Sequence, residues 1–263
     1  MSSWLACIDL DGTLLTSSEQ VTPYTRAALQ NFRAEGNKVA LVTGRHPRTA
    51  LPIKQMCGEI DGLACFNGSW VMGSKGRKIH AASFDKKVIQ ILARELKELN
   101  VPVVWSVDDA LYITNEPVFF PYDHRYIPVI NGQPPPEKEI WKITLLIENE
   151  ENRREVHQWC RGIVEAQWIE SSGRTMDLMP LHQSKGYALE KLAAQSGIPL
   201  SNTIAIGNWD NDISMLEKAE IGVAMTNSSK TLFSIANEIA GHHDDHGVAR
   251  WLSARCHSRL SRV

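Results

Sequence analysis

Short apolar runs alternate with amphipathic stretches over the first part of the chain. Residues 4–9 (WLACID) form a mostly apolar run that ends in an acid, which is typical of a strand buried on both faces. Similar runs follow at residues 38–42 and 63–66, and helical patterns lie between them at 22–36 and 46–57. Strands that alternate with helices predict a parallel sheet with helices packed on its faces.

The pattern changes in the middle of the chain. We expect hairpin strands at 69–72 and 78–84, followed by a helix capped by Asp85. Further strands are expected at 103–107, 111–114, 140–148 and 166–170, with one helix near 151–164. Residues 115–138 are rich in proline and aromatic residues, so they form either a binding loop or a mobile one, with Tyr122, His124 and Arg125 as candidate substrate contacts. This region is predicted to be α+β.

The alternation of helix and strand returns after about residue 183. Expected helices and strands follow one another at 187–196, 203–206, 210–218, 221–224, 228–236 and 247–254. The predicted fold class is therefore α/β: residues 1–82 and 183–263 form a doubly wound, Rossmann-like parallel sheet. Residues 83–182 are inserted as a smaller α+β domain.

Charge and cysteine content narrow the class of protein. The 28 Lys and Arg residues balance 30 Asp and Glu residues in a chain of 263, so the net charge of −2 gives no reason to expect nucleic acid or a membrane as partner. Five scattered cysteines without a C-x-x-C pair indicate reduced thiols. We find no pattern of a signal peptide and expect a cytoplasmic enzyme. The oligomeric state is not predictable.

The string Asp9-Leu10-Asp11-Gly12-Thr13 carries the clearest chemistry. Side chains two apart on a strand point to the same side, so the carboxylates of Asp9 and Asp11 are expected to share one pocket. Their repulsion is tolerable only if a cation neutralises them or one stays protonated. Asp9 could then act as a nucleophile, while Asp11 protonates a leaving oxygen and later deprotonates water. The alternative is an acidic turn with Asp11 and Thr13 as local caps.

This string resembles the first motif of the haloacid dehalogenase superfamily, in particular the Cof-like phosphatases with a cap inserted late in the core. Three further segments resemble the family's motifs in order: Thr43-Gly44-Arg45, whose threonine would bind the phosphoryl group; Ser184-Lys185-Gly186, whose lysine would neutralise charge; and Gly207–Asp212. The resemblance implies Asp9, Asp11, Thr43 and Lys185 as catalytic residues. It implies substrate contacts from Gly12, Thr13, Gly44, Arg45, Asn67, Gly68 and Asn227.

The fourth segment implies a magnesium site with one departure from the family pattern. Asn208 stands where the family usually has an aspartate, so the site loses one negative charge although an amide oxygen can still bind Mg²⁺. The resemblance places Asp9, the backbone carbonyl of Asp11, Asn208, Asn211 and Asp212 near the metal. The string His242-His243-Asp244-Asp245-His246 also suggests a metal site, but adjacent residues seldom converge on one ion, so we interpret it as a solvated helix cap.

The predicted function is a magnesium-dependent phosphatase that hydrolyses a small phosphorylated metabolite, such as a sugar phosphate, through an aspartyl phosphate. Two alternatives remain. A phosphomutase or phosphotransferase would pass the same phosphoryl group to a second hydroxyl. A regulatory protein that binds phosphometabolites without turnover would fit the missing carboxylate at position 208.

Overall fold

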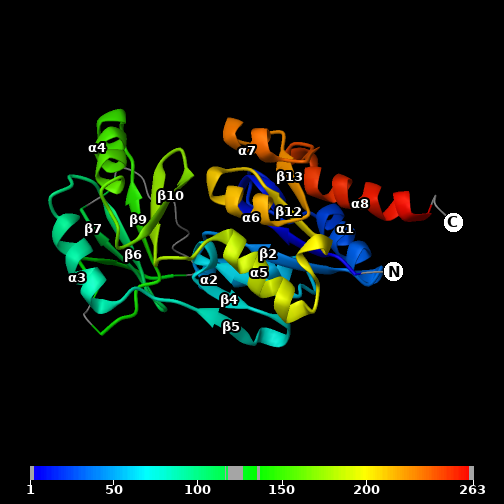
Figure 1. The fold of residues 1–263 in the computed structure, drawn as a ribbon, viewed down its shortest axis with the longest axis horizontal. Coiled ribbons are helices and arrows are strands. Elements are labelled where there is room, and N and C mark those ends of the chain that lie inside the picture. Colours follow the sequence, from blue (N-terminus) through cyan, green and yellow to red (C-terminus); the bar gives the residue numbers. More distant parts are fainter. Residues whose placement is uncertain (1–2, 116, 118–126, 135–136, 261–263) are drawn as a thin grey trace. The chain divides into compact units, whose positions relative to one another are not determined.

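The computed structural model describes residues 3–115, 117, 127–134 and 137–260. The chain forms two compact units, one from Met1–His80 with Ser184–Val263 and one from Ala81–Gln183. Both ends of the chain therefore belong to the first unit (Figure 1). The loop candidates Tyr122, His124 and Arg125 lie outside the described residues.

An eight-stranded sheet forms the centre of the first unit. Its strands run in the order β14-β13-β12-β1-β2-β3-β4-β5, and the six from β14 to β3 pair in parallel, while β4 pairs antiparallel with β3. In chain order the strands are β1 Leu5–Ile8, β2 Lys38–Val42, β3 Gly62–Cys65, β4 Trp70–Met72, β5 Lys78–Ala81, β12 Thr203–Gly207, β13 Ile221–Met225 and β14 Glu238–Ala240. The chain leaves β1 toward β2 and later returns on its other side at β12, so the strand order reverses there. In doubly wound sheets ligands bind at this switch point, beyond the carboxyl ends of the strands.

The helices of the first unit cover the sheet. They are α1 Pro23–Ala34, α2 Pro47–Met56, α5 Lys185–Ser196, α6 Ile213–Lys218, α7 Lys230–Ile235 and α8 Gly247–Leu260. Helices α5 and α6 lie side by side, as do α1 and α8 (Figure 1). The apolar side chains of α5, such as Leu189 and Leu192, pack with Leu5 and Cys7 of β1. All four residues of β1 are fully buried, which explains why its sequence is apolar without alternation.

The second unit is an α+β sandwich of two layers. Its six-stranded sheet has the order β10-β11-β9-β6-β7-β8 and is antiparallel except between β7 and β8. The elements are α3 Lys86–Glu95, β6 Val103–Ser106, β7 Leu111–Thr114, β8 Val129–Asn131, β9 Lys142–Leu146, α4 Glu150–Cys160, β10 Gln167–Ser172 and β11 Thr175–Met179. Leu92 of α3 and Val156 of α4 pack on Trp105, Ile143 and other residues of one sheet face.

The predicted α/β class with its parallel core and α+β second part is confirmed, with local differences. Helix α5 begins at Lys185, because the Ser184 hydroxyl accepts a hydrogen bond from the Tyr187 amide and caps the helix there. The predicted helix over 210–218 opens with a separate 3₁₀ turn, Asp210–Asp212. Strands β8, β11 and β14 were not predicted; β8 and β14 have only three residues each, too few for a periodic pattern.

Candidate active site

Four of the predicted site residues follow four neighbouring parallel strands, β12, β1, β2 and β3. Asp9 comes directly after β1, Thr43 after β2, Asn67 closely after β3 and Asn208 after β12. Because these strands are parallel neighbours, their carboxyl ends lie along one edge of the sheet. The sheet thus gathers residues that are up to about two hundred positions apart in the sequence.

Lys185 connects two buried carboxylates at this edge. Its Nζ donates to Oδ1 of Asp9 and to Oδ1 of Asp212, both at 2.6 Å. Asp9, Lys185 and Asp212 are 4%, 1% and 0% exposed, so water screens these charges little. Two buried carboxylates face one ammonium group, which leaves a formal excess of one negative charge in the cluster.

The pKa of Asp9 reflects this surplus of negative charge. Burial raises the pKa of the Asp9 carboxyl to about 7; the Lys185 ammonium opposes the rise, while the charges of Asp212 and Asp11 add to it. Burial by itself would lower the pKa of Lys185, but the Asp212 and Asp9 carboxylates outweigh this and hold it above its ordinary value. Lys185 therefore stays charged, and Asp9 can take up a proton near neutral pH.

Asp11 does not continue strand β1, so the expected alternation of strand side chains does not apply to it. The strand ends at Ile8, and residues Leu10–Leu14 form a turn that is closed by a hydrogen bond from the Leu15 amide to the Leu10 carbonyl. Inside this turn Asp11 is extended (φ −76°, ψ 120°) and Gly12 is left-handed (φ 69°). The left-handed backbone at position 12 favours glycine, and a Cβ there would lie 2.3 Å from Nδ2 of Asn208, so any other residue would displace that amide. This turn separates the surroundings of the two acids: Asp9 is buried, and the Asp11 side chain is 54% exposed.

Arg45 holds the exposed Asp11 carboxylate. Its Nε donates to Oδ2 of Asp11 at 2.8 Å, and its second nitrogen donates both to Oδ1 of Asp11 and, at 2.9 Å, to Oε1 of Glu19. Burial lowers the pKa of Arg45, but its bonds to Asp11 and Glu19 outweigh this, so it stays charged. Arg45 is therefore engaged by two protein carboxylates, and Glu19, which belongs to no motif, was missed from the sequence.

The loop after β12 organises around Asp212. The second carboxylate oxygen of Asp212 accepts hydrogen bonds from the backbone amides of Asn208, at 2.8 Å, and Trp209, at 3.1 Å. A Cβ on Gly207 would lie within 2.6 Å of the Asp212 side chain, so this approach needs glycine. Oδ1 of Asn208 accepts from the Thr13 hydroxyl at 3.2 Å, which connects the fourth predicted segment to the first.

The remaining predicted residues brace the same edge. The Thr43 hydroxyl is buried and accepts from the Arg45 amide at 3.1 Å. Nδ2 of Asn211 donates to Oδ1 of Asn67 at 3.2 Å, and a Cβ on Gly44 would meet that same oxygen at 2.9 Å.

Gly68 and Asn227 complete the set. Gly68 has φ 103° and lies so close to the Ser184 carbonyl that a Cβ would meet it at 2.2 Å. Nδ2 of Asn227 donates to the Gly12 carbonyl at 2.7 Å, and its Oδ1 accepts from the His243 amide at 3.4 Å. The Asn227 amide therefore joins two backbone segments.

The donor set fits a hard divalent cation. Asp9, Asn208, Asn211 and Asp212 offer only oxygen atoms as ligands, which is what Mg²⁺ prefers. A cation would also offset the excess negative charge of the buried cluster. Asp212 already accepts from Lys185 and two backbone amides, so its carboxylate is better suited to orient the loop than to bind an ion directly.

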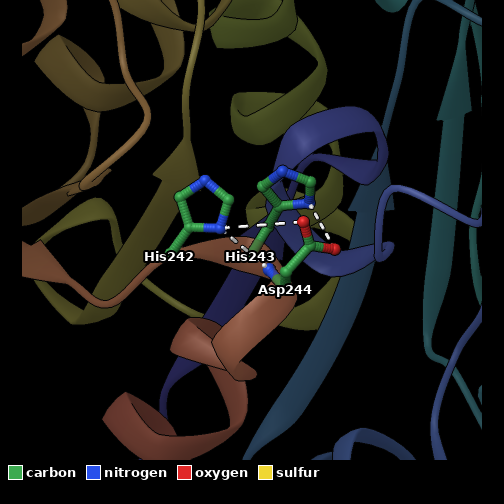
Figure 2. Close-up of side chains that lie close together, drawn as sticks. All are labelled: His242, His243 and Asp244. Carbon is green, nitrogen blue, oxygen red and sulfur yellow. Dashed lines mark hydrogen bonds and ion pairs between the residues drawn. The ribbon is translucent and has the colours of Figure 1, made fainter.

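A second group of possible ligands lies in the loop before α8. One ligand atom from each of His242, His243 and Asp244 falls within 4.8 Å of the others (Figure 2). These side chains also make local bonds: Nδ1 of His242 accepts from the Asp244 amide at 3.3 Å and caps the 3₁₀ turn His243–Asp245. The predicted cap is present, but it caps this 3₁₀ turn and not α8 itself, and the His243 side chain is only 12% exposed, so the predicted solvated character does not apply to it.

Comparison with known proteins identifies the class that this fold and site define. The family model for haloacid dehalogenase-like hydrolases matches residues 6–252, so the chain belongs to that family. It is 27% identical to the phosphatase YwpJ of Bacillus subtilis, covering 94% of this chain and 98% of the relative. It is 26% identical to the pyridoxal phosphate phosphatase YbhA of Escherichia coli, covering 96% and 98%.

A solved structure agrees with this assignment. A haloacid dehalogenase-like hydrolase from B. subtilis superimposes with a TM-score of 0.84 at 26% identity, covering 95% of this chain and 98% of that one. The predicted family is confirmed, and the named relatives place the chain among phosphatases. None of the helices in the described part of the chain combines the length and apolar character needed to cross a membrane.

Proposed function

We propose that this protein is a magnesium-dependent phosphatase that hydrolyses a small phosphate monoester through a phosphorylated Asp9. The observation that carries the proposal is the buried cluster of Asp9, Lys185 and Asp212. A nucleophilic carboxylate must approach a phosphate that is itself negative, and the Lys185 ammonium at 2.6 Å reduces that repulsion. Family membership supports the reaction class.

In this mechanism a carboxylate oxygen of Asp9 attacks phosphorus in line with the leaving oxygen. The bond to phosphorus forms as the ester P–O bond breaks, and Asp11 gives a proton to the departing alcohol. Asp11 then removes a proton from the water that hydrolyses the aspartyl phosphate. Thr43, backbone amides of the Gly12–Thr13 turn, Gly44, Asn67 and Gly68 would hold the phosphoryl oxygens.

Magnesium would supply positive charge against the phosphoryl oxygens and the nucleophile. We propose Asp9, the Asp11 backbone carbonyl and Asn208 as its protein ligands, with Asp212 and Asn211 acting through orientation or bridging water. Arg45 and Asn227 remain candidates for substrate contact, although both now have partners within the protein.

The substrate is proposed to be a small phosphorylated metabolite, with sugar phosphates as the first class to test. The pyridoxal phosphate named for YbhA is also a small phosphate ester. We propose that residues 83–182 act as a cap that selects the leaving group, and that the enzyme works in the cytoplasm. The five cysteines are all described and buried, and none of them forms a disulfide, which suits a reducing compartment.

The test is a phosphate-release screen over sugar phosphates, pyridoxal phosphate and p-nitrophenyl phosphate with added magnesium. Wild type is compared with Asp9→Asn and with Asp109→Asn, which removes an exposed carboxylate of the second unit. We expect release by wild type and Asp109→Asn only. Binding without release would favour the regulatory protein, and release that appears only with an acceptor alcohol would favour the phosphotransferase.

A further inference from the structure

Four side-chain contacts connect the loop before α8 to the segment that follows the proposed acid–base residue. Ser17 donates to the Asp244 carboxylate through both its backbone amide and its hydroxyl, each at 2.7 Å. Nδ1 of His243 donates to the Leu15 carbonyl at 2.9 Å, and Nδ1 of His246 lies 3.3 Å from the Thr22 hydroxyl. The loop therefore bonds to both ends of residues 15–22.

These bonds use the side chains that otherwise look like a metal site. Figure 2 shows His242, His243 and Asp244 turned toward one another, with dashed lines from both rings to Asp244. Because the carbonyl of Leu15 can only accept, Nδ1 of His243 carries a hydrogen. Both oxygens of Asp244 accept from Ser17. The group is thus organised to hold a segment of its own chain.

The segment it holds reaches the proposed active site through Glu19. Glu19 has a left-handed backbone, with φ 57°, at the turn closed by Thr16 and Gln20. Its carboxylate accepts from Arg45, and the Arg45 guanidinium binds the Asp11 carboxylate through two nitrogens. A two-pronged bond from a planar guanidinium fixes the orientation of a carboxylate as well as its position.

Stability gives little reason for this arrangement. The side chains of Asp11, Glu19 and Asp244 are 54%, 54% and 42% exposed, and ion pairs at such exposure contribute little to folding. Proton transfer, by contrast, depends strongly on where the acid or base is held. We therefore interpret these contacts by the orientation that they impose on the Asp11 carboxylate and not by a gain in folding stability.

We propose that Asp244 and Glu19 are positioning residues for proton transfer by Asp11. Asp244 holds residues 15–22 through Ser17, and Glu19 on that segment holds Arg45, which orients Asp11. The inference rests on the proposed function, in which Asp11 protonates the leaving alcohol.

The test compares two phosphate esters whose leaving groups need a proton to different degrees. The alkoxide of glycerol 2-phosphate is strongly basic and needs protonation, whereas p-nitrophenolate leaves without it. The quantity to measure is kcat/KM, which covers only the steps up to departure of the leaving group. We expect Asp244→Ala and Glu19→Ala each to lower kcat/KM for glycerol 2-phosphate about tenfold more than for p-nitrophenyl phosphate.

Three further variants make the test specific. Asp244→Asn can still accept from the Ser17 amide and should restore most of the activity. Asp245→Ala removes the exposed neighbouring carboxylate, for which no side-chain partner occurs among the described residues, and should leave both esters unchanged. The double variant Glu19→Ala/Asp244→Ala should lose less than the product of the two single losses, because both act through Arg45.

The possible results distinguish failure of the positioning role from failure of the proposed phosphatase function. Equal losses for both esters, or no loss in either alanine variant, would overturn the positioning role while the phosphatase stands. A wild-type protein that releases phosphate from neither ester would overturn the proposed function and the inference with it.

Discussion

The Nζ atom of Lys185 lies 2.6 Å from Oδ1 of Asp9, although 176 positions separate the two residues in the sequence. The same nitrogen binds Asp212, so one ammonium group serves two buried carboxylates. A buried charge cluster of this kind is costly unless every member stays paired. Removing a carboxylate from this cluster should therefore stabilise the folded protein, and removing the ammonium group should destabilise it.

Replacing Asp9 with asparagine should abolish phosphate release and stabilise the metal-free protein. We expect activity to fall at least about a thousandfold, because the nucleophile is lost. The folded-state pKa of about 7 exceeds the ordinary 3.8, so wild type loses stability as pH rises between these values. Asp9→Asn escapes that loss and should be more stable at about pH 8 by about 1–3 kcal/mol.

Urea unfolding at several pH values checks this expectation. The stability advantage of Asp9→Asn should grow from about pH 5 to about pH 7 and then level off. An advantage that is constant across this range would show that Asp9 is not protonated in the folded protein near neutrality.

Replacing Lys185 with methionine should act in the opposite direction. Asp9 and Asp212 would remain buried without their ammonium partner, and breaking a buried ion pair in this way costs about 3–5 kcal/mol. The double variant Asp9→Asn/Lys185→Met removes one of the two stranded carboxylates, so it should be more stable than Lys185→Met alone. Thermal unfolding of the four proteins measures the coupling, and additive effects would argue against a shared cluster.

Magnesium binding to the substrate-free protein should release protons near neutral pH. The raised pKa of Asp9 means that a proton occupies part of the population below about pH 7, and a metal ligand must lose it. The affinity for magnesium should therefore fall by up to about tenfold per pH unit below pH 7. Calorimetry in buffers of different ionisation enthalpy measures the protons released, and a count near zero at about pH 6 would contradict the assignment of Asp9 as a ligand.

Replacing Asn208 with aspartate should strengthen magnesium binding by roughly tenfold, since a carboxylate adds negative charge to the ligand set. Asn31→Asp is a matched control, because it makes the same change at an exposed position of α1, outside the proposed ligand set. A titration in which Asn208→Asp binds magnesium no better than wild type would count against Asn208 as a ligand.

The sequence predicted those parts of the fold and site whose residues lie within a short stretch of the chain. The apolar run before Asp9 and the alternation of strand and helix predicted the parallel core, because full burial and helical periodicity leave local marks. Resemblance to known motifs then selected Thr43, Lys185 and the 207–212 loop, all of which lie at the carboxyl ends of core strands or at the start of a capped helix.

Other features of the structure depend on contacts between distant segments and could not be predicted from any short stretch of sequence. The turn at Leu10–Leu14 replaces the expected continuation of the strand, and Gly12 within it lies against Asn208, a residue distant in the sequence. The contact of Ser17 with Asp244 spans 227 positions and involves residues that are common in any surface loop. Such pairs become visible only once the fold brings the segments together.

The central claim is that Asp9 accepts the phosphoryl group. The most direct measurement is rapid acid quenching of Asp11→Asn mixed with p-nitrophenyl phosphate, followed by mass spectrometry of its peptides. This variant lacks the base for the second step, so the aspartyl phosphate should accumulate, and we predict one added phosphoryl group on the peptide that contains Asp9. Release of p-nitrophenolate in the first turnover without phosphorylation of that peptide would contradict the account.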